Sequence, residues 1–146
     1  MIAFLLLAIA YSTPVLLAAL GELVCERTGI VNIGLEGQML VGALVAVMVS
    51  IATGQPLLGA MAALLASALM GGLFALFSVG MKRDQVIVGT TLNFLALGLT
   101  GVWFRAWLKG VKSPTAPTLP GWDSWSVLTF LALLLAPLFH YLINRT

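Results

Sequence analysis

The residues best suited to chemistry lie in a polar run between two apolar segments. Glu36 is flanked by Gly34 and Gly37, and Asn32 precedes them. A carboxylate is costly near hydrocarbon, so its presence there is by default a functional hypothesis. The glycines indicate backbone that bends or unwinds, which a membrane tolerates only where protein or a water-filled cavity covers it. We interpret Asn32, Gly34, Glu36 and Gly37 as candidates for a translocation path or a hinge. The structural alternatives are an interfacial Glu36 that caps backbone amides and an Asn32 that satisfies freed backbone groups.

Three charged residues stand just before this run. Glu22 and Glu26 are one helical turn apart, and Arg27 follows Glu26. Side chains four residues apart on a helix are neighbours. The three residues are therefore candidates for a gate or for a surface that contacts a partner. They could equally mark the polar end of a membrane helix, where Arg27 offsets one carboxylate.

Asn93 stands alone inside an apolar stretch, where its amide needs a partner on another helix. Such an interhelical hydrogen bond contributes about 1 kcal/mol, and lining of a pore is the alternative role. His140 has no second ligand in register, and Cys25 is the only cysteine, so we expect no metal site and no catalytic residue. The chain also lacks the Gly-Lys-Ser/Thr element that cradles phosphates. We expect no cofactor, and any ATP must be bound by another chain.

Composition places the protein in a membrane. Of its 146 residues, 61% are hydrophobic and 8% are charged, whereas a soluble domain carries about 25% charged residues. The net charge of +2 comes without a Lys/Arg cluster, so no nucleic-acid partner is expected. The predicted fold class is an all-α, polytopic membrane helix bundle, with residues 1–146 in a single transmembrane domain.

A membrane helix needs about 20 mainly apolar residues. The stretches that qualify are residues 2–24, 32–52, 57–81, 86–108 and 125–143, which predicts about five spans. Pro14 should kink the first span. The purely apolar body of the second, 39–52, is too short to cross alone, and extending it back to Asn32 includes Glu36. We therefore predict a broken or partly unwound start to this span, and a tight turn at 53–56.

Other patterns support these boundaries. Small residues recur four apart in the third span, as in Ala62/Ala66, Ser67/Gly71 and Ala68/Gly72, a spacing that lets membrane helices approach closely. Residues 82–85 form a charged loop and 109–124 a proline-containing polar loop. The tryptophans fall at one face of this layout, since Trp103 and Trp107 close the fourth span and Trp122 and Trp125 open the fifth. They predict an interfacial belt.

The distribution of Lys and Arg gives a weak signal for the orientation of the chain in the membrane. One predicted side holds Arg27, Lys82, Arg83 and Arg145, and the other holds Arg105, Lys109 and Lys112. Cytoplasmic loops carry the excess of Lys and Arg. We therefore place the side with Lys82 and Arg145 in the cytoplasm and the amino terminus outside.

Three stretches together resemble a known family. They are TPVLLAALGEL (13–23), ERTGIVNIGLEGQMLVGA (26–43) and DQVIVGTTLNFLALGLT (84–100). They resemble permease subunits of ATP-binding-cassette importers, in particular the simple-sugar and nucleoside type, related to the ribose and branched-chain amino-acid permeases. The likeness covers most of residues 12–105 in the expected order. It implies that 32–37 forms a broken-helix element near the translocation path.

The resemblance also implies partners and a location. It implies a multi-pass protein of the bacterial inner (plasma) membrane that moves a nucleoside or simple sugar by ATP-driven alternating access. A second permease subunit, a cytoplasmic ATP-binding subunit and an extracytoplasmic substrate-binding protein would complete the assembly, in contact with membrane lipid and a small-molecule solute. The chain matches the amino-terminal half of such a permease, so we expect it to be incomplete at the carboxyl terminus.

Two other functions fit the same residues. The chain could be a small oligomeric proton-coupled carrier with Glu36 as the proton-binding carboxylate. It could also be a permease fragment that does not transport. Dependence of uptake on the proton gradient without an ATPase partner would favour the carrier.

Overall fold

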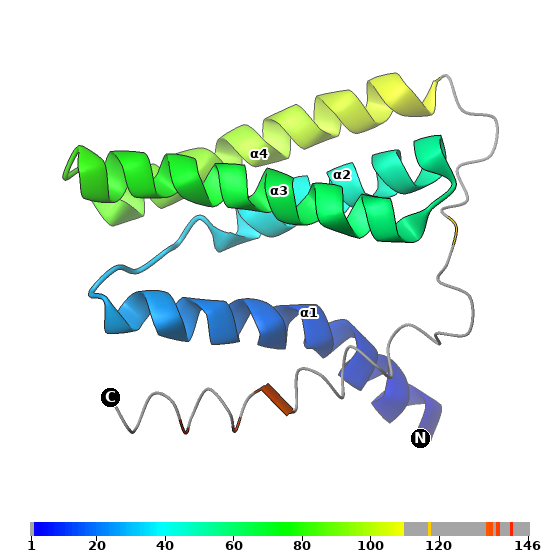
Figure 1. The fold of residues 1–146 in the computed structure, drawn as a ribbon, viewed down its shortest axis with the longest axis horizontal. Coiled ribbons are helices and arrows are strands. Elements are labelled where there is room, and N and C mark those ends of the chain that lie inside the picture. Colours follow the sequence, from blue (N-terminus) through cyan, green and yellow to red (C-terminus); the bar gives the residue numbers. More distant parts are fainter. Residues whose placement is uncertain (1, 110–116, 118–133, 136, 138–140, 142–146) are drawn as a thin grey trace. The chain divides into compact units, whose positions relative to one another are not determined.

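The computed structural model describes residues 2–109, 117, 134, 135, 137 and 141. These residues form helices and no strand, which confirms the all-α prediction (Figure 1). The chain divides into two compact units, one of residues 1–29 with 118–146 and one of residues 30–117. The predicted span 125–143 lies largely outside the described residues, as do Trp122, Trp125 and His140.

Helix α1 (Ile2–Arg27) contains the whole first predicted span and continues through Pro14 as one helix. Its ribbon changes direction in the amino-terminal half, in agreement with the predicted kink (Figure 1). Proline cannot donate to the carbonyl one turn back. The hydroxyls of Ser12 and Thr13 both donate to the carbonyl of Ile9, each over 2.9 Å, and such bonds often bend helices.

Helices α2 (Leu35–Thr53) and α3 (Pro56–Ala75) form a hairpin. α2 begins at Leu35, after an irregular stretch where the broken start of the second span was predicted. Its C-cap residue is Gly54, whose φ of 70° is in the left-handed region and whose N–H donates to the carbonyl of Ser50 over 2.9 Å. Pro56 then starts α3, where its missing N–H is no loss. The predicted turn at 53–56 is confirmed.

Small residues line the contact between these two helices. A Cβ added to Gly59 would clash with the side chain of Ser50 and lie 2.6 Å from the carbonyl oxygen of Ala46. A Cβ added to Gly42 would clash with the hydroxyl of Ser67. Ser67 also donates to the carbonyl of Gln38 over 3.1 Å. Close approach of small residues is how membrane helices associate without a hydrophobic driving force.

The predicted small-residue pairs divide between two surfaces. Ser67/Gly71 lies at the α2–α3 contact, since a Cβ on Gly71 would meet the side chain of Gln38 at 3.7 Å. In contrast, Ala68 and Gly72 are exposed among the described residues, and a Cβ on Gly72 would meet nothing within 4 Å.

α3 passes directly into a π-helical turn, η1 (Leu76–Gly80). The hydroxyl of Ser78 donates to the carbonyl of Phe74 over 2.6 Å in this region. The chain then reverses at the predicted charged loop, where Lys82 has a positive φ of 53°. Gln85, predicted in this loop, instead opens helix α4 (Gln85–Leu108). The Asp84 carboxylate caps α4 by accepting from the backbone N–H groups of Val86 and Ile87 over 2.8 and 3.2 Å.

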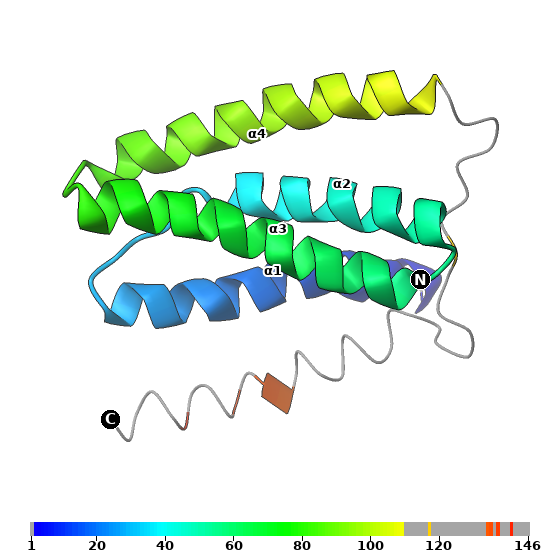
Figure 2. The ribbon, with the colours of Figure 1, turned by 45° about the horizontal axis from the view of Figure 1, so that its top comes forward.

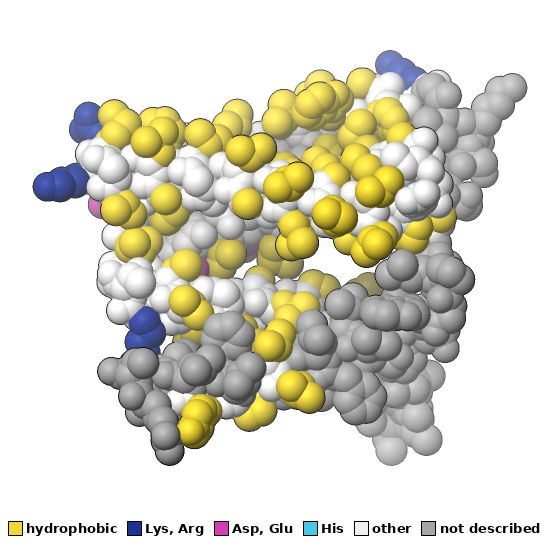
Figure 3. Space-filling model, viewed as in Figure 1, with side chains coloured by type: hydrophobic (Ala, Val, Ile, Leu, Met, Phe, Trp, Pro, Cys, Tyr) yellow, Lys and Arg dark blue, Asp and Glu magenta, His cyan; other side chains and the backbone are white. Residues whose placement is uncertain are grey.

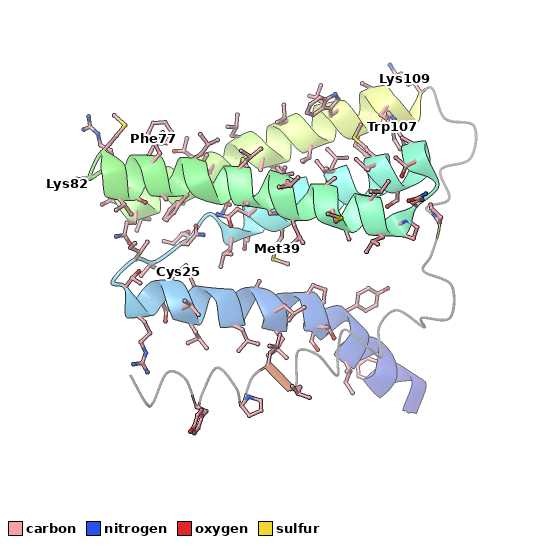
Figure 4. All side chains as sticks on the ribbon, in the orientation of Figure 1. Cys25, Met39, Phe77, Lys82, Trp107 and Lys109 are labelled. Atoms are coloured by element: carbon pink, nitrogen blue, oxygen red, sulfur yellow. The ribbon has the colours of Figure 1, made fainter. Side chains whose placement is uncertain are left out.

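Among the described residues, α2, α3 with η1, and α4 are long and apolar enough to cross a membrane. In the unit of residues 30–117, the face in view carries hydrophobic side chains along the helices and Lys or Arg at their ends (Figure 3). Lys82 and Lys109 lie at opposite ends of α4 (Figure 4). α4 diverges from α2 and α3 toward its carboxyl end (Figure 2). The spanning of α1 and the orientation stay predictions.

Candidate functional site

The segment between α1 and α2 is irregular, as the polar run predicted. Residues 28–34 have no helical assignment. The segment opens with a turn at Gly29, whose φ of 78° suits glycine. Near its other end the side-chain oxygen of Asn32 accepts from the N–H of Gly34 over 3.1 Å. Asn32 therefore satisfies freed backbone, as its structural interpretation predicted.

The helical boundary divides the predicted motif 32–37. Asn32 and Gly34 lie in the irregular segment, whereas Glu36 and Gly37 lie in the first turn of α2. Gly34 is the N-cap residue and offers no side chain to the free N–H groups at the helix start. These groups must find acceptors elsewhere, because lipid provides none.

Asn93 on α4 supplies that acceptor from across the bundle. Its Oδ1 accepts from the N–H of Gly37 over 2.8 Å, and its Nδ2 donates to the carbonyl of Ile33 over 2.9 Å. One amide therefore binds backbone on both sides of the Gly34 N-cap. The interhelical role predicted for Asn93 is present, with main-chain partners.

Glycines bring the two backbones together at this point. A Cβ on Gly37 would lie 2.9 Å from Asn93 Oδ1 and 3.1 Å from the Cα of Asn93. A Cβ on Gly89 would lie 2.9 Å from the backbone nitrogen of Gly34 and 3.0 Å from the carbonyl carbon of Ile33. Gly34, Gly37 and Gly89 are all buried. The structure thus gives Gly37 a packing role inside regular helix, where the sequence indicated bending.

Gln85 makes a contact that was not predicted from the sequence. Its Oε1 accepts from the N–H of Val31 over 2.8 Å. The signal available in the sequence was spacing, because Gln85, Gly89 and Asn93 recur every fourth residue and so share one face of α4.

Glu36 borders a cavity of about 400 Å³ between the start of α2 and the middle of α4. Its polar lining comes from Glu36, Thr90 and Asn93, and the other residues at its walls are Ile33, Gly37, Leu40, Phe94 and Leu97. Glu36 is exposed. Its position in the first turn of α2 suits a carboxylate, since the helix dipole is positive there.

Glu22, Glu26 and Arg27 lie at the carboxyl end of α1, in the other compact unit. Glu26 and Arg27 are exposed, whereas Glu22 is half-buried. Cys25 is a free thiol beside them. Within the described residues, no group of three or more His, Cys, Asp or Glu could hold a metal ion.

The apolar helices and the partly polar cavity between α2 and α4 define an α-helical membrane protein. The chain belongs to the family described as branched-chain amino acid transport system / permease component, whose model matches residues 4–146. This membership confirms the importer-permease resemblance that the sequence motifs indicated.

Several curated relatives are named as ABC transporter permeases. The chain is 40% identical over 98 residues to the guanosine ABC transporter permease NupQ of Bacillus subtilis, covering 63% of this chain and 31% of the relative. It is 39% identical over 98 residues to a putative glucose ABC transporter permease of Haloferax volcanii, covering 67% of this chain and 30% of the relative. A second Bacillus subtilis guanosine permease, NupP, is 29% identical over 152 residues, covering 92% of this chain and 44% of the relative. The chain thus spans about a third of the length of the first two relatives. No solved structure matches the chain.

Proposed function

We propose that the chain is part of the permease subunit of an ATP-binding-cassette importer that moves nucleosides or simple sugars across the bacterial inner membrane. Membership of the permease family supports this, as do relatives named for guanosine and glucose transport. The mechanism is alternating access, in which partner subunits bind and hydrolyse ATP and the permease moves around a path within the membrane. The chain itself supplies path-lining groups and no catalytic residue.

The cavity beside the irregular segment carries the proposal. Glu36 on α2 and Thr90 on α4 line this cavity, and both helices are otherwise apolar enough to cross a membrane. Such groups are costly there and mark substrate pathways. Asn32, Gly34, Gly37 and Asn93 surround the same segment and remain the other candidates for the path.

The hydrogen bonds of the site indicate which groups are available to a solute. Asn93 binds backbone with its Oδ1 and with one of its two Nδ2 hydrogens. The Thr90 hydroxyl donates to the carbonyls of Val86 and Ile87 over 2.8 and 3.1 Å, so it can offer only an acceptor. An ionised Glu36 is acceptor-only. Apart from the second Nδ2 hydrogen of Asn93, the polar groups of the cavity are acceptors. The cavity therefore suits a solute that donates hydrogen bonds, as the hydroxyls of a sugar or a ribose do.

The partners follow from the same proposal. They are a second permease subunit, a cytoplasmic ATP-binding subunit and an extracytoplasmic substrate-binding protein, in addition to lipid and solute. Glu22, Glu26 and Arg27 are our candidates for a gate or a partner-facing surface, because Glu26 and Arg27 are exposed at the end of α1 and Glu22 lies one turn before Glu26.

Uptake measurements on Glu36→Gln test the proposal. Glu36→Gln keeps an acceptor oxygen but removes its charge. A hydrogen bond to a charged group contributes about 1.5–3 kcal/mol and a neutral one about 1 kcal/mol, so uptake efficiency should fall about 2- to 30-fold. The assay compares labelled guanosine and glucose uptake by cells that carry the complete operon. Asp84→Asn is the matched control, since this carboxylate caps α4 and lies outside the cavity lining. Unchanged uptake with Glu36→Gln at normal membrane levels would remove Glu36 from the path.

One observation favours a second candidate, the proton-coupled carrier. The Glu36 carboxylate is exposed and borders the cavity, and a carboxylate among membrane-spanning helices is the kind of group that proton relays use. Uptake in liposomes that follows an imposed proton gradient without ATP would support the carrier. Uptake that requires the ATP-binding subunit and ATP would exclude it.

A further inference from the structure

One face of α4 carries the contacts that hold the irregular segment. Gln85, Gly89 and Asn93 follow one another at four-residue intervals. At about 1.5 Å per residue, the outer two are separated by about 12 Å along the helix. Gln85 and Asn93 present amides, and Gly89 between them presents backbone without a side chain.

All three contacts are made to main chain. Gln85 accepts from the N–H of Val31. Asn93 accepts from the N–H of Gly37 and donates to the carbonyl of Ile33. At Gly89, a Cβ would lie 2.9 Å from the backbone nitrogen of Gly34 and 3.0 Å from the carbonyl carbon of Ile33. The contacts do not depend on polar side chains of the segment.

The segment has few good hydrogen bonds of its own. Ile33 N–H donates to the carbonyl of Val31 over 3.2 Å, and Leu35 N–H donates to that of Asn32 over 3.4 Å, which is long for an N–H···O bond. Irregular backbone at membrane depth persists only where other groups satisfy it. Gln85 and Asn93 on α4 therefore supply hydrogen bonds to this backbone, as water does for a surface loop.

We propose that Gln85 and Asn93 are positioning residues that bind the backbone of residues 31–37 and make the start of α2 move with α4 during transport. Gly89 allows the contact by leaving room for the segment. Gly29 lies upstream of the anchored part; its φ is positive, and a Cβ added there would meet nothing within 4 Å. The transport role rests on the proposed function, whereas the anchoring does not.

Amide hydrogen exchange on the purified chain in lipid nanodiscs tests the anchoring. Gln85→Leu removes the acceptor at similar size, and Gln85→Glu keeps an acceptor oxygen. An ordinary hydrogen bond contributes about 1 kcal/mol, so Gln85→Leu should speed exchange at Val31 about fivefold to tenfold. Gln85→Glu should restore slow exchange. The amides of Thr28 and Gly29 bond to carbonyls of α1 and serve as internal controls.

A second pair of variants probes the other end of the segment. Asn93→Asp keeps an acceptor for the N–H of Gly37 and loses the donor to Ile33, whereas Asn93→Leu loses both. Exchange at Gly37 should therefore rise more in Asn93→Leu than in Asn93→Asp. Unchanged exchange at Val31 in Gln85→Leu would overturn the proposal. So would equal acceleration throughout α2 and α3 in both Gln85 variants, because that result shows general loosening.

Uptake by the complete transporter tests the consequence for transport. Gln85→Leu should lower the maximal rate severalfold with little change in the half-saturating solute concentration, and Gln85→Glu should recover the rate. The maximal rate must be expressed per transporter in the membrane, because a purely structural role would lower the amount of transporter and leave the rate per transporter unchanged. If the unmodified protein moves no solute but the exchange pattern holds, the proposed function fails and the anchoring stands. If transport occurs and both variants match it, the positioning role fails.

Discussion

Gly89→Ala probes the close contact between α4 and the irregular segment with a single methyl group. The added Cβ would lie 2.9 Å from the backbone nitrogen of Gly34 and 3.0 Å from both the carbonyl carbon and the Cβ of Ile33. Two of these atoms belong to the main chain and cannot move away by a change of rotamer. We therefore expect the substitution to push the segment away from α4.

The size of the effect follows from a matched pair of glycines on α4. Overpacking of this kind costs about 1–3 kcal/mol, while alanine gains up to about 1 kcal/mol over glycine in a helix interior. Gly98→Ala provides the same gain in the same helix, and its Cβ would meet nothing within 4 Å. The helix-propensity term cancels in the comparison. Gly89→Ala should therefore be about 1–3 kcal/mol less stable than Gly98→Ala.

Unfolding by SDS in mixed micelles, followed by far-UV circular dichroism, measures this difference. A change of 1.4 kcal/mol corresponds to about tenfold in the unfolding equilibrium constant, which is readily resolved. Both variants must first insert in the membrane at similar levels. Equal midpoints for Gly89→Ala and Gly98→Ala would refute the close approach of the two backbones at residue 89.

Variants at three further positions test other parts of the fold. Gly59→Ala should cost about 1–3 kcal/mol in the same unfolding assay, because its Cβ would meet the Ala46 carbonyl at 2.6 Å; a stability equal to that of the parent would contradict the α2–α3 contact. Asp84→Ala removes the cap of α4 and should cost about 1 kcal/mol, whereas Asp84→Asn, which keeps an acceptor, should cost less. Gly29→Ala should destabilise by about 1–2 kcal/mol because its φ is positive, and Gly29→Asn, which tolerates this conformation, should be milder. Identical unfolding of the two Gly29 variants would argue against the left-handed turn.

The boundaries of most helices could be predicted from the sequence, because local chemistry sets them. Gly54 and Pro56 end α2 and start α3 where the turn was predicted. Asp84 caps α4 one residue before its observed start. The irregular segment was predicted from Glu36 and its glycines, since an apolar body of 39–52 is too short to cross a membrane.

The sequence alone therefore determined the class of protein, the approximate helices and the position of the irregular segment, because composition, span length and turn residues act locally. Only the tertiary structure decided what holds that segment. The contacts of Val31 with Gln85 and of Gly37 with Asn93 join residues 54 and 56 positions apart. Their formation depends on how α2 and α4 pack, and Gly89 allows that packing because it has no side chain. A single sequence does not encode such a register locally, since an isolated Gln or Asn has many possible partners.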